Sequence, residues 1–115
     1  MADAQKDSLI RAIERVAVII TEKNKVPLRC EFSDGTLQIS AQTAMGTAQE
    51  SVAVDVNGDP VTVGYNHRFL LEALKALDAD EARLYIGGAA APLVISDTDS
   101  AFTYLILPVR LKEGK

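Results

Sequence analysis

The chain has 115 residues, of which 48% are hydrophobic and 24% charged, which is typical of one globular domain and excludes a wholly disordered protein. Its apolar runs are far shorter than a membrane span, its N-terminus is not a secretory signal, and its single cysteine excludes an internal disulfide framework and fits a reducing cytoplasm. The net charge of −4 conceals an acidic middle, with −8 over residues 30–102 and +2 at each end, which argues against a surface that binds nucleic acid throughout.

The first predicted element is a helix over residues 8–22, where apolar residues recur at the spacing of one helix face. Asp7 or Ser8 would cap its N-terminus. The residues off the apolar stripe include Arg11, Arg15 and Glu22, and also Val18 and Ile19. The arginines fit either a basic strip or an ordinary solvated surface, whereas an exposed apolar pair is something that a monomer would not need.

Four strands are predicted next. Residues 28–33 and 36–42 alternate apolar and polar side chains on either side of Asp34-Gly35, a dipeptide typical of a two-residue hairpin turn. Residues 48–56 alternate again through three valines and end before an Asn-Gly-Asp-Pro turn, and residues 61–65 form a short strand. The turns between these segments indicate antiparallel pairing.

The second helix is predicted from its N-cap, Asn66, to about Leu77. Its apolar stripe consists of Phe69, Leu70, Ala73, Ala76 and Leu77. Three more strands follow, at residues 81–86, 92–96 and 101–107. The order of helix and then strands therefore occurs twice, which predicts an internal duplication of about 57 residues. We expect an α+β domain with two helices packed on one side of two antiparallel sheets.

The residues that could carry catalysis or hold a metal do not form a site in the sequence. His67 falls off the apolar stripe of its helix and is interpreted as a surface residue, and Cys30 alternates with apolar strand residues and is interpreted as a packing residue. Gly87-Gly88 lacks the helix that a phosphate-binding loop needs, and Asp97–Ser100 fits a hairpin turn better than a calcium loop. We therefore expect no catalytic residue, no metal and no cofactor.

Two motifs carry a family resemblance. Residues 64–66 read Gly-Tyr-Asn before a helix that contains Phe69, and residues 108–111 read Pro-Val-Arg-Leu. In this order and at this spacing, the motifs resemble those of the third, C-terminal domain of the bacterial sliding clamp, the beta subunit of DNA polymerase III. The resemblance runs from about Leu9 to Leu111.

The resemblance implies a DNA-clamp (processivity) fold and a non-catalytic role in DNA replication. Clamps of this family are ring homodimers, in which two chains of three such domains join head to tail and encircle double-stranded DNA without sequence preference in the bacterial cytoplasm. The ring tethers DNA polymerases, the clamp loader and repair proteins, whose Gln-Leu-x-Leu-Phe-type motifs enter a peptide-binding pocket between the second and third domains. The alternative is a free-standing short clamp-like protein that assembles with itself or modulates the full-length clamp.

The resemblance also assigns site residues by position. The peptide-binding pocket would be lined by Asn66, Phe69, Ala90, Pro92, Leu105, Ile106, Leu107, Pro108, Val109, Arg110 and Leu111. For Phe69, core packing on its helix stripe and direct contact with a ligand both stay open. The DNA-facing residues would be Arg11 and Arg15, and the residues at the interface between subunits would be Val18, Ile19 and Glu50.

We expect a single domain over residues 1–115, with its core at about 8–111 and flexible ends at 1–7 and 112–115. Chains of the family hold three such domains and this chain holds one. Half of the peptide pocket and the partner of the interface residues would therefore be missing. We expect weak peptide binding at best, and no loading onto DNA by this domain alone.

Overall fold

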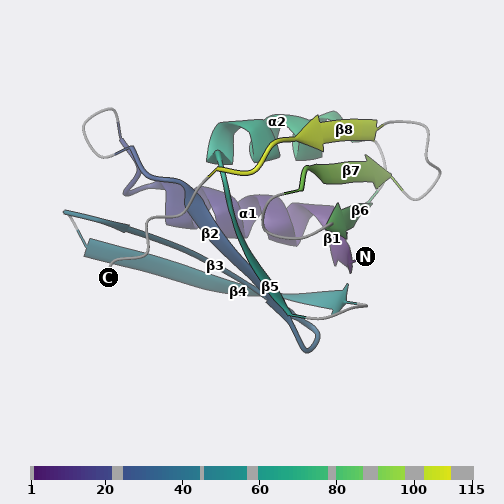
Figure 1. Cartoon of the computed structure of the whole chain (residues 1–115), viewed down its shortest axis with the longest axis horizontal. Helices are drawn as coiled ribbons and strands as arrows, with labels where there is room; N and C mark the ends of the chain where they lie inside the picture. Colours follow the sequence, from purple (N-terminus) through teal and green to yellow (C-terminus); the bar gives the residue numbers. More distant parts are fainter. Residues whose placement is uncertain are drawn as a thin grey trace.

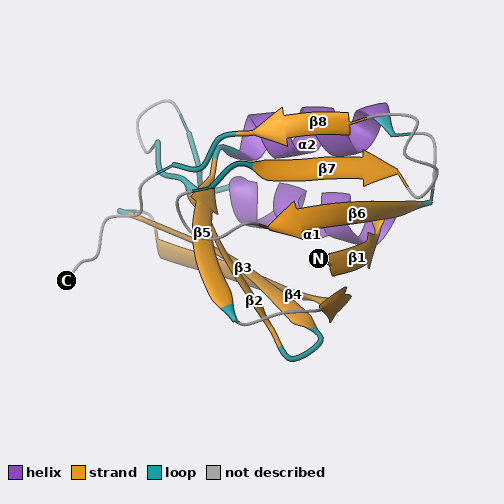
Figure 2. Ribbon diagram, turned by 45° about the vertical axis from the view of Figure 1, so that its right-hand side comes forward, coloured by secondary structure: helices purple, strands orange, loops and turns teal. Residues whose placement is uncertain are grey.

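The computed structural model of the chain describes residues 2–21, 25–44, 46–56, 60–77, 80–86, 91–97 and 103–109. Its elements follow in the order β1 (Ala2–Gln5), α1 (Lys6–Ala17), β2 (Leu28–Ser33), β3 (Thr36–Thr43), β4 (Gly46–Val56), β5 (Val61–Tyr65), α2 (His67–Ala76), β6 (Glu81–Ile86), β7 (Leu93–Asp97) and β8 (Thr103–Ile106) (Figure 1). Both helices pack on one antiparallel sheet, which confirms the predicted α+β class (Figure 2).

The sheet contains all of these strands in the order β5-β2-β3-β4-β1-β6-β7-β8. The sequence predicted two sheets, and strand β1 accounts for the difference. Ala2 of β1 pairs with Val56 of β4 on one side and with Leu84 of β6 on the other. Ala2 and Ala4 are buried, so the expectation of a flexible segment over residues 1–7 is wrong for this strand. A strand of two alanines, an aspartate and a glutamine carries too little hydrophobic alternation to be predicted.

The two halves of the chain repeat one order of elements, which is β1-α1-β2-β3-β4 and then β5-α2-β6-β7-β8. This repeat confirms the predicted duplication in architecture. The first strand of each half pairs with the other half, β1 with β6 and β5 with β2. The exchange of strands ties the two halves into one domain.

The hydrophobic core lies between the helices and the sheet. The helices bury Leu9, Ala12, Ile13 and Val16 from α1 and Leu70, Ala73 and Leu74 from α2. Strand β2 buries every second residue, Leu28, Cys30 and Phe32, as its alternation predicts. None of the helices in the described ranges is both long and apolar enough to cross a membrane.

Helix α1 begins two residues earlier than its pattern predicted and ends at Ala17. The backbone N–H of Lys6, its first residue, donates to the carbonyl oxygen of Asp80 at 2.7 Å. This contact with the segment after α2 satisfies one of the donors that a helix start leaves open. Neither Asp7 nor Ser8 therefore acts as the N-cap, because both lie inside the helix.

Candidate functional site

The candidate site begins where the last strand ends. Leu105 is 65% and Leu107 is 67% exposed, whereas Ile106 between them is buried. The strand was predicted to reach residue 107, but it ends at Ile106, because Pro108 has no N–H and cannot continue a ladder. The segment therefore contributes to the core on one face and presents an exposed apolar pair on the other.

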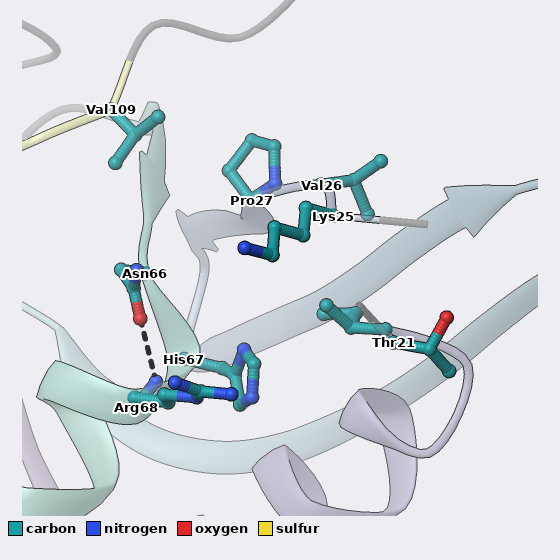
Figure 3. Close-up of a pocket in the computed structure, with 9 residues that line it drawn as sticks. Thr21, Lys25, Val26, Pro27, Asn66, His67, Arg68 and Val109 are labelled. Carbon is teal, nitrogen blue, oxygen red and sulfur yellow. Dashed lines mark hydrogen bonds between the residues drawn. The ribbon is translucent and has the colours of Figure 1, made fainter. Parts of the chain in front are cut away.

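A backbone bridge joins this segment to the far end of the sheet. The N–H of Val109 donates to the carbonyl oxygen of Gly64 in β5 at 2.8 Å. Since β5 and β8 stand at opposite ends of the strand order, the sheet curves until its two ends are linked. Val109 and Asn66, which follows β5 directly, consequently line the same cavity (Figure 3).

Helix α2 starts at this point of the fold. Asn66 is its N-cap, as predicted, and its Oδ1 accepts a hydrogen bond from the N–H of Arg68 at 2.9 Å. Phe69 in the first turn is 56% exposed, because α2 turns Leu70 and Ala73 toward the core. Of the two roles left open for Phe69, this exposure excludes core packing in the domain and leaves the ring available to a ligand.

Apolar side chains extend this surface across three strands. Tyr85 of β6 pairs with Val94 of β7, and Val94 pairs with Leu105 of β8. Residues paired in this way lie on one face of a sheet, and Tyr85 is 41% exposed. Tyr85 was not predicted as a site residue, although its place after the buried Leu84 in an alternating strand was the available signal.

The remaining predicted pocket residues have different surroundings. Pro92 is exposed and Pro108 is half-buried. Ile106 is buried, so the prediction that it lines the pocket is corrected, because alternate strand residues face opposite sides and this one supports the segment from beneath. The residues that lie outside the described part of the chain are Ala90, Arg110 and Leu111.

A cavity of about 320 Å³ lies beside Asn66 (Figure 3). It forms where the segment after α1, the start of α2 and the segment after β8 meet, and its lining includes Lys25, Val26, Pro27, Asn66, Arg68 and Val109. Asn66 and Val109 were predicted pocket residues. The others were not, because no pattern in the sequence brings residues 25–27 to the start of the second helix.

His67 also lines this cavity and is half-buried rather than fully on the surface. Burial and the neighbouring charge of Arg68 lower the pKa of His67 below its ordinary value, so its imidazole is neutral near pH 7. The permanent positive charges of the cavity are therefore those of Lys25 and Arg68.

Helix α1 and strand β4 form a second surface of interest. Nη2 of Arg15 lies 3.1 Å from Oε1 of Glu50. These two residues were predicted to face different partners, DNA and a second protomer, but they form an ion pair with each other. Arg11 and Arg15 line a groove of about 260 Å³ between α1 and β4, together with Ser8 and Ser51.

The predicted apolar pair at the end of α1 is only partly exposed. Val18 is 74% exposed, whereas Ile19 is half-buried and packs against the core. The chain leaves the helix after Ala17, which turns Ile19 inward instead of leaving it on the helix surface. The prediction of an exposed pair is corrected to a single exposed valine.

The described residues offer little to catalysis or metal binding. Among them, no group of three or more His, Cys, Asp or Glu side chains could hold a metal ion. Burial raises the pKa of the Cys30 thiol to about 12, so this cysteine is a poor nucleophile near pH 7. The arrangement at the end of β8 is suited to non-covalent recognition of an apolar ligand.

Comparisons with known proteins agree with the fold. A family model of the C-terminal domain of the DNA polymerase III beta subunit matches residues 1–110. The beta sliding clamp of Synechococcus elongatus is 32% identical over 108 residues, which are 90% of this chain and 28% of that protein. A putative DNA polymerase III beta subunit from Eubacterium rectale superposes with a TM-score of 0.90 at 30% identity, over 94% of this chain and 29% of that one.

A sliding clamp from Bartonella birtlesii, solved bound to griselimycin, has a TM-score of 0.89 at 25% identity and covers 96% of this chain and 30% of that one. This chain therefore spans less than a third of the length of these relatives.

Proposed function

Because this chain belongs to the family formed by the C-terminal domain of the DNA polymerase III beta subunit, we propose that residues 1–115 serve as the third domain of a bacterial sliding clamp. In that role the domain is non-catalytic and takes part in DNA replication in the cytoplasm. The complete clamp would be a ring of two chains joined head to tail around double-stranded DNA. It would hold DNA polymerases, the clamp loader and repair proteins through Gln-Leu-x-Leu-Phe-type motifs.

The exposed apolar segment at the end of β8 is the observation that carries this proposal. Leu105, Leu107 and Phe69 each expose more than half of a large apolar side chain. Phe69 lies in the first turn of α2, and the two leucines lie at and just after the end of β8. Large exposed apolar side chains of this kind favour a binding surface, because large exposed apolar patches mark interaction sites. The leucines and the phenylalanine of the motif are the side chains that such a surface would remove from water.

A titration with peptide tests the proposal. Isotope-labelled protein is titrated with a peptide that contains Gln-Leu-Ser-Leu-Phe, and a peptide of scrambled sequence is the control. We expect selective amide shifts at Phe69, Leu105, Leu107 and Val109, with a Kd on the order of millimolar, because the second domain's half of the pocket is absent.

Two matched substitutions sharpen the test. Leu107→Ser should abolish the selective shifts, whereas Val18→Ser, which changes an equally exposed residue, should leave them unchanged. Shifts that are equal for the scrambled peptide would overturn the proposal. So would binding below the micromolar range, because a half-pocket should not bind the motif tightly.

The ring part of the proposal rests on α1 and β4. Within the described strands, Gly46–Ala53 of β4 pair with β3 alone, while Val54–Val56 pair with β1. The other edge of this stretch has backbone groups that a neighbouring domain could pair with, and Val18 is exposed nearby on the end of α1. Arg11 and Arg15 would contact DNA phosphates without sequence preference, with Arg15 exchanging Glu50 for phosphate.

The same open edge favours a second candidate function. A free-standing clamp-like protein would use the edge of β4 and Val18 to assemble with itself or to modulate a full-length clamp. The two candidates differ in the partner that covers the edge, which is another domain of a longer chain in one case and a second copy of this chain in the other. The state of association in solution separates them.

A further inference from the structure

The cavity beside Asn66 combines apolar walls with positive charge. The apolar surface comes from Val26, Pro27 and Val109. The positive charges are those of Lys25 and Arg68. No described residue of the lining is acidic. Figure 3 shows the Lys25 side chain pointing toward the start of α2, where Arg68 lies beside His67. A ligand group that fits both features is an anion on a partly apolar chain.

The start of α2 adds to the positive potential. The helix has ten residues and no acidic residue in its first turn, so the positive end of its dipole is not offset within the helix. Arg68 lines the cavity and lies beside His67 at this helix start (Figure 3), so its charge adds to the potential there. Three independent sources of positive potential therefore meet at one cavity of about 320 Å³, a size typical of binding pockets.

The cavity lies at the end of the exposed apolar segment. Leu105, Leu107 and Val109 are exposed at alternate positions, from the end of β8 to the bridge at Val109. An extended chain rises about 3.3 Å per residue, so this row covers roughly 13 Å from Leu105 to Val109. A peptide with an apolar side chain on Leu105 would place a residue about four positions away at the cavity, and one with an apolar side chain on Leu107 would place a residue about two positions away there.

We propose that this cavity is a carboxylate-binding subsite, which takes an Asp or Glu that flanks the apolar motif of a bound peptide. The inference rests on the proposed peptide-binding function and adds a charge preference to it. A peptide fits better than a nucleic acid, because the cavity shares Asn66 and Val109 with the apolar site. The two arginines of α1 line a different groove.

The experiment compares peptides that differ in flank charge alone. The motif Gln-Leu-Ser-Leu-Phe is extended by four residues on either its N-terminal or its C-terminal side, and each extension is made once with two Glu and once with two Gln. Amide shifts of the full chain give the Kd of each peptide. We expect one of the two acidic peptides to bind about fivefold more tightly than its Gln counterpart, as for an exposed ion pair.

Protein variants test whether the tighter binding of the acidic peptide depends on the cavity. The double substitution of Lys25→Gln and Arg68→Gln should remove the preference for the acidic flank, so that the Glu-flanked and Gln-flanked peptides bind the variant equally. Lys75→Gln is the matched control, because it removes a cation from the last turn of the same helix, where Lys75 pairs with Glu14. This control should keep the full preference.

Each outcome has one meaning. If the Gln-flanked motif peptides produce no selective shifts at all, the proposed function fails. If they bind and neither acidic flank improves the Kd, the carboxylate subsite alone is overturned. It is also overturned if Lys75→Gln abolishes the preference as fully as the double variant, or if a single-stranded oligonucleotide shifts Lys25 and Arg68 more strongly than the acidic peptides do.

Discussion

At the end of β8, neighbouring residues have different roles on the two sides of the backbone. Ile106 packs into the core, whereas Leu105 and Leu107 are exposed and available for binding. Ile106 is 4% exposed and stabilises the core, whereas its neighbours leave most of their side chains in water. Pro108 then ends the ladder, and the bridge from Val109 to Gly64 fixes where the chain goes next. An exposed residue held on such a fixed backbone can bind a partner without a large ordering cost.

Cys30 gives a prediction at the same scale. Burial raises its pKa from an ordinary 9.0 to about 12, so the thiol stays neutral in the folded chain at pH values where the unfolded chain ionises. The resulting contribution to stability is complete below about pH 9 and is lost as the pH rises toward 12. From pH 9 to pH 10 we expect the free energy of unfolding to fall by about 1 kcal/mol through this group.

Urea unfolding at pH 8, 9 and 10 measures this loss, with the Cys30→Ala variant as reference. The variant lacks the thiol and should be less stable overall but should show a smaller loss above pH 9. Burial, and to a smaller extent Cys30 itself, also raise the pKa of Tyr65, which contributes in the same direction at higher pH in both proteins. Parallel pH profiles for the two proteins would contradict the prediction.

Strand β1 has four residues, and it joins the two parts of the sheet. Among the described strands it lies between β4 and β6 and pairs with both of them. Its position is reinforced by Arg83, whose guanidinium contacts the Asp3 carboxylate at 2.9 Å in a partly buried ion pair. The joint between the halves therefore combines two buried alanine side chains with one partly buried ion pair.

Substitution of Ala4 tests this role. Ala4 is 3% exposed between Val54 and Ala82, so Ala4→Asp would bury an unpaired carboxylate in the joint. We expect a loss of at least about 2 kcal/mol in the free energy of unfolding, measured by urea denaturation. The control is Ala53→Asp, the same change at an exposed position of β4, which should alter stability by less than about 0.5 kcal/mol. Equal losses would mean that β1 is not a required joint.

The elements with clear periodicity were predictable, and those held by tertiary contacts were not. Residues 28–33, 61–65 and 81–86 were predicted as strands to the residue, because each is bounded by turn signals. The start of α1 was misplaced, since its first N–H bonds to Asp80, a residue far away in the sequence. Periodicity also assigned Phe69 to the core, because a stripe defined from sequence does not show which edge of it the sheet will cover.

The candidate site followed the same division. Leu105, Leu107 and Asn66 were predicted from a family motif; the structure leaves both leucines exposed and places Asn66 at the N-cap of α2. The pair of Arg15 with Glu50 and the cavity around Lys25 were not predicted. Both arise from contacts between segments that are distant in the sequence. The distribution of charge along the chain does not predict such tertiary contacts.

At the scale of the whole molecule, the strand order leaves one long edge partly uncovered. Linking β5 to the segment after β8 closes one end of the curved sheet, but Gly46–Ala53 of β4 pair with β3 alone within the described strands. Natural proteins cover or charge such edges, because free backbone groups invite pairing with other chains. Glu50 lies on this edge and pairs with Arg15 of the same chain. A charged side chain at this position disfavours pairing of the edge with other chains.

The state of association tests which partner covers this edge. A domain whose partner is another part of a longer clamp should be a monomer at low protein concentration. Its two proposed interface surfaces, the β4 edge with Val18 and the apolar segment at the end of β8, would each bind another domain and not each other. Sedimentation velocity across a wide range of protein concentration measures this directly. We expect a single species with the mass of one chain, and we expect Val18→Asp to change neither the mass nor the shape. A stable oligomer that Val18→Asp dissociates would instead establish the self-assembling candidate, since an exposed valine beside an open strand edge would then be buried between copies of the chain.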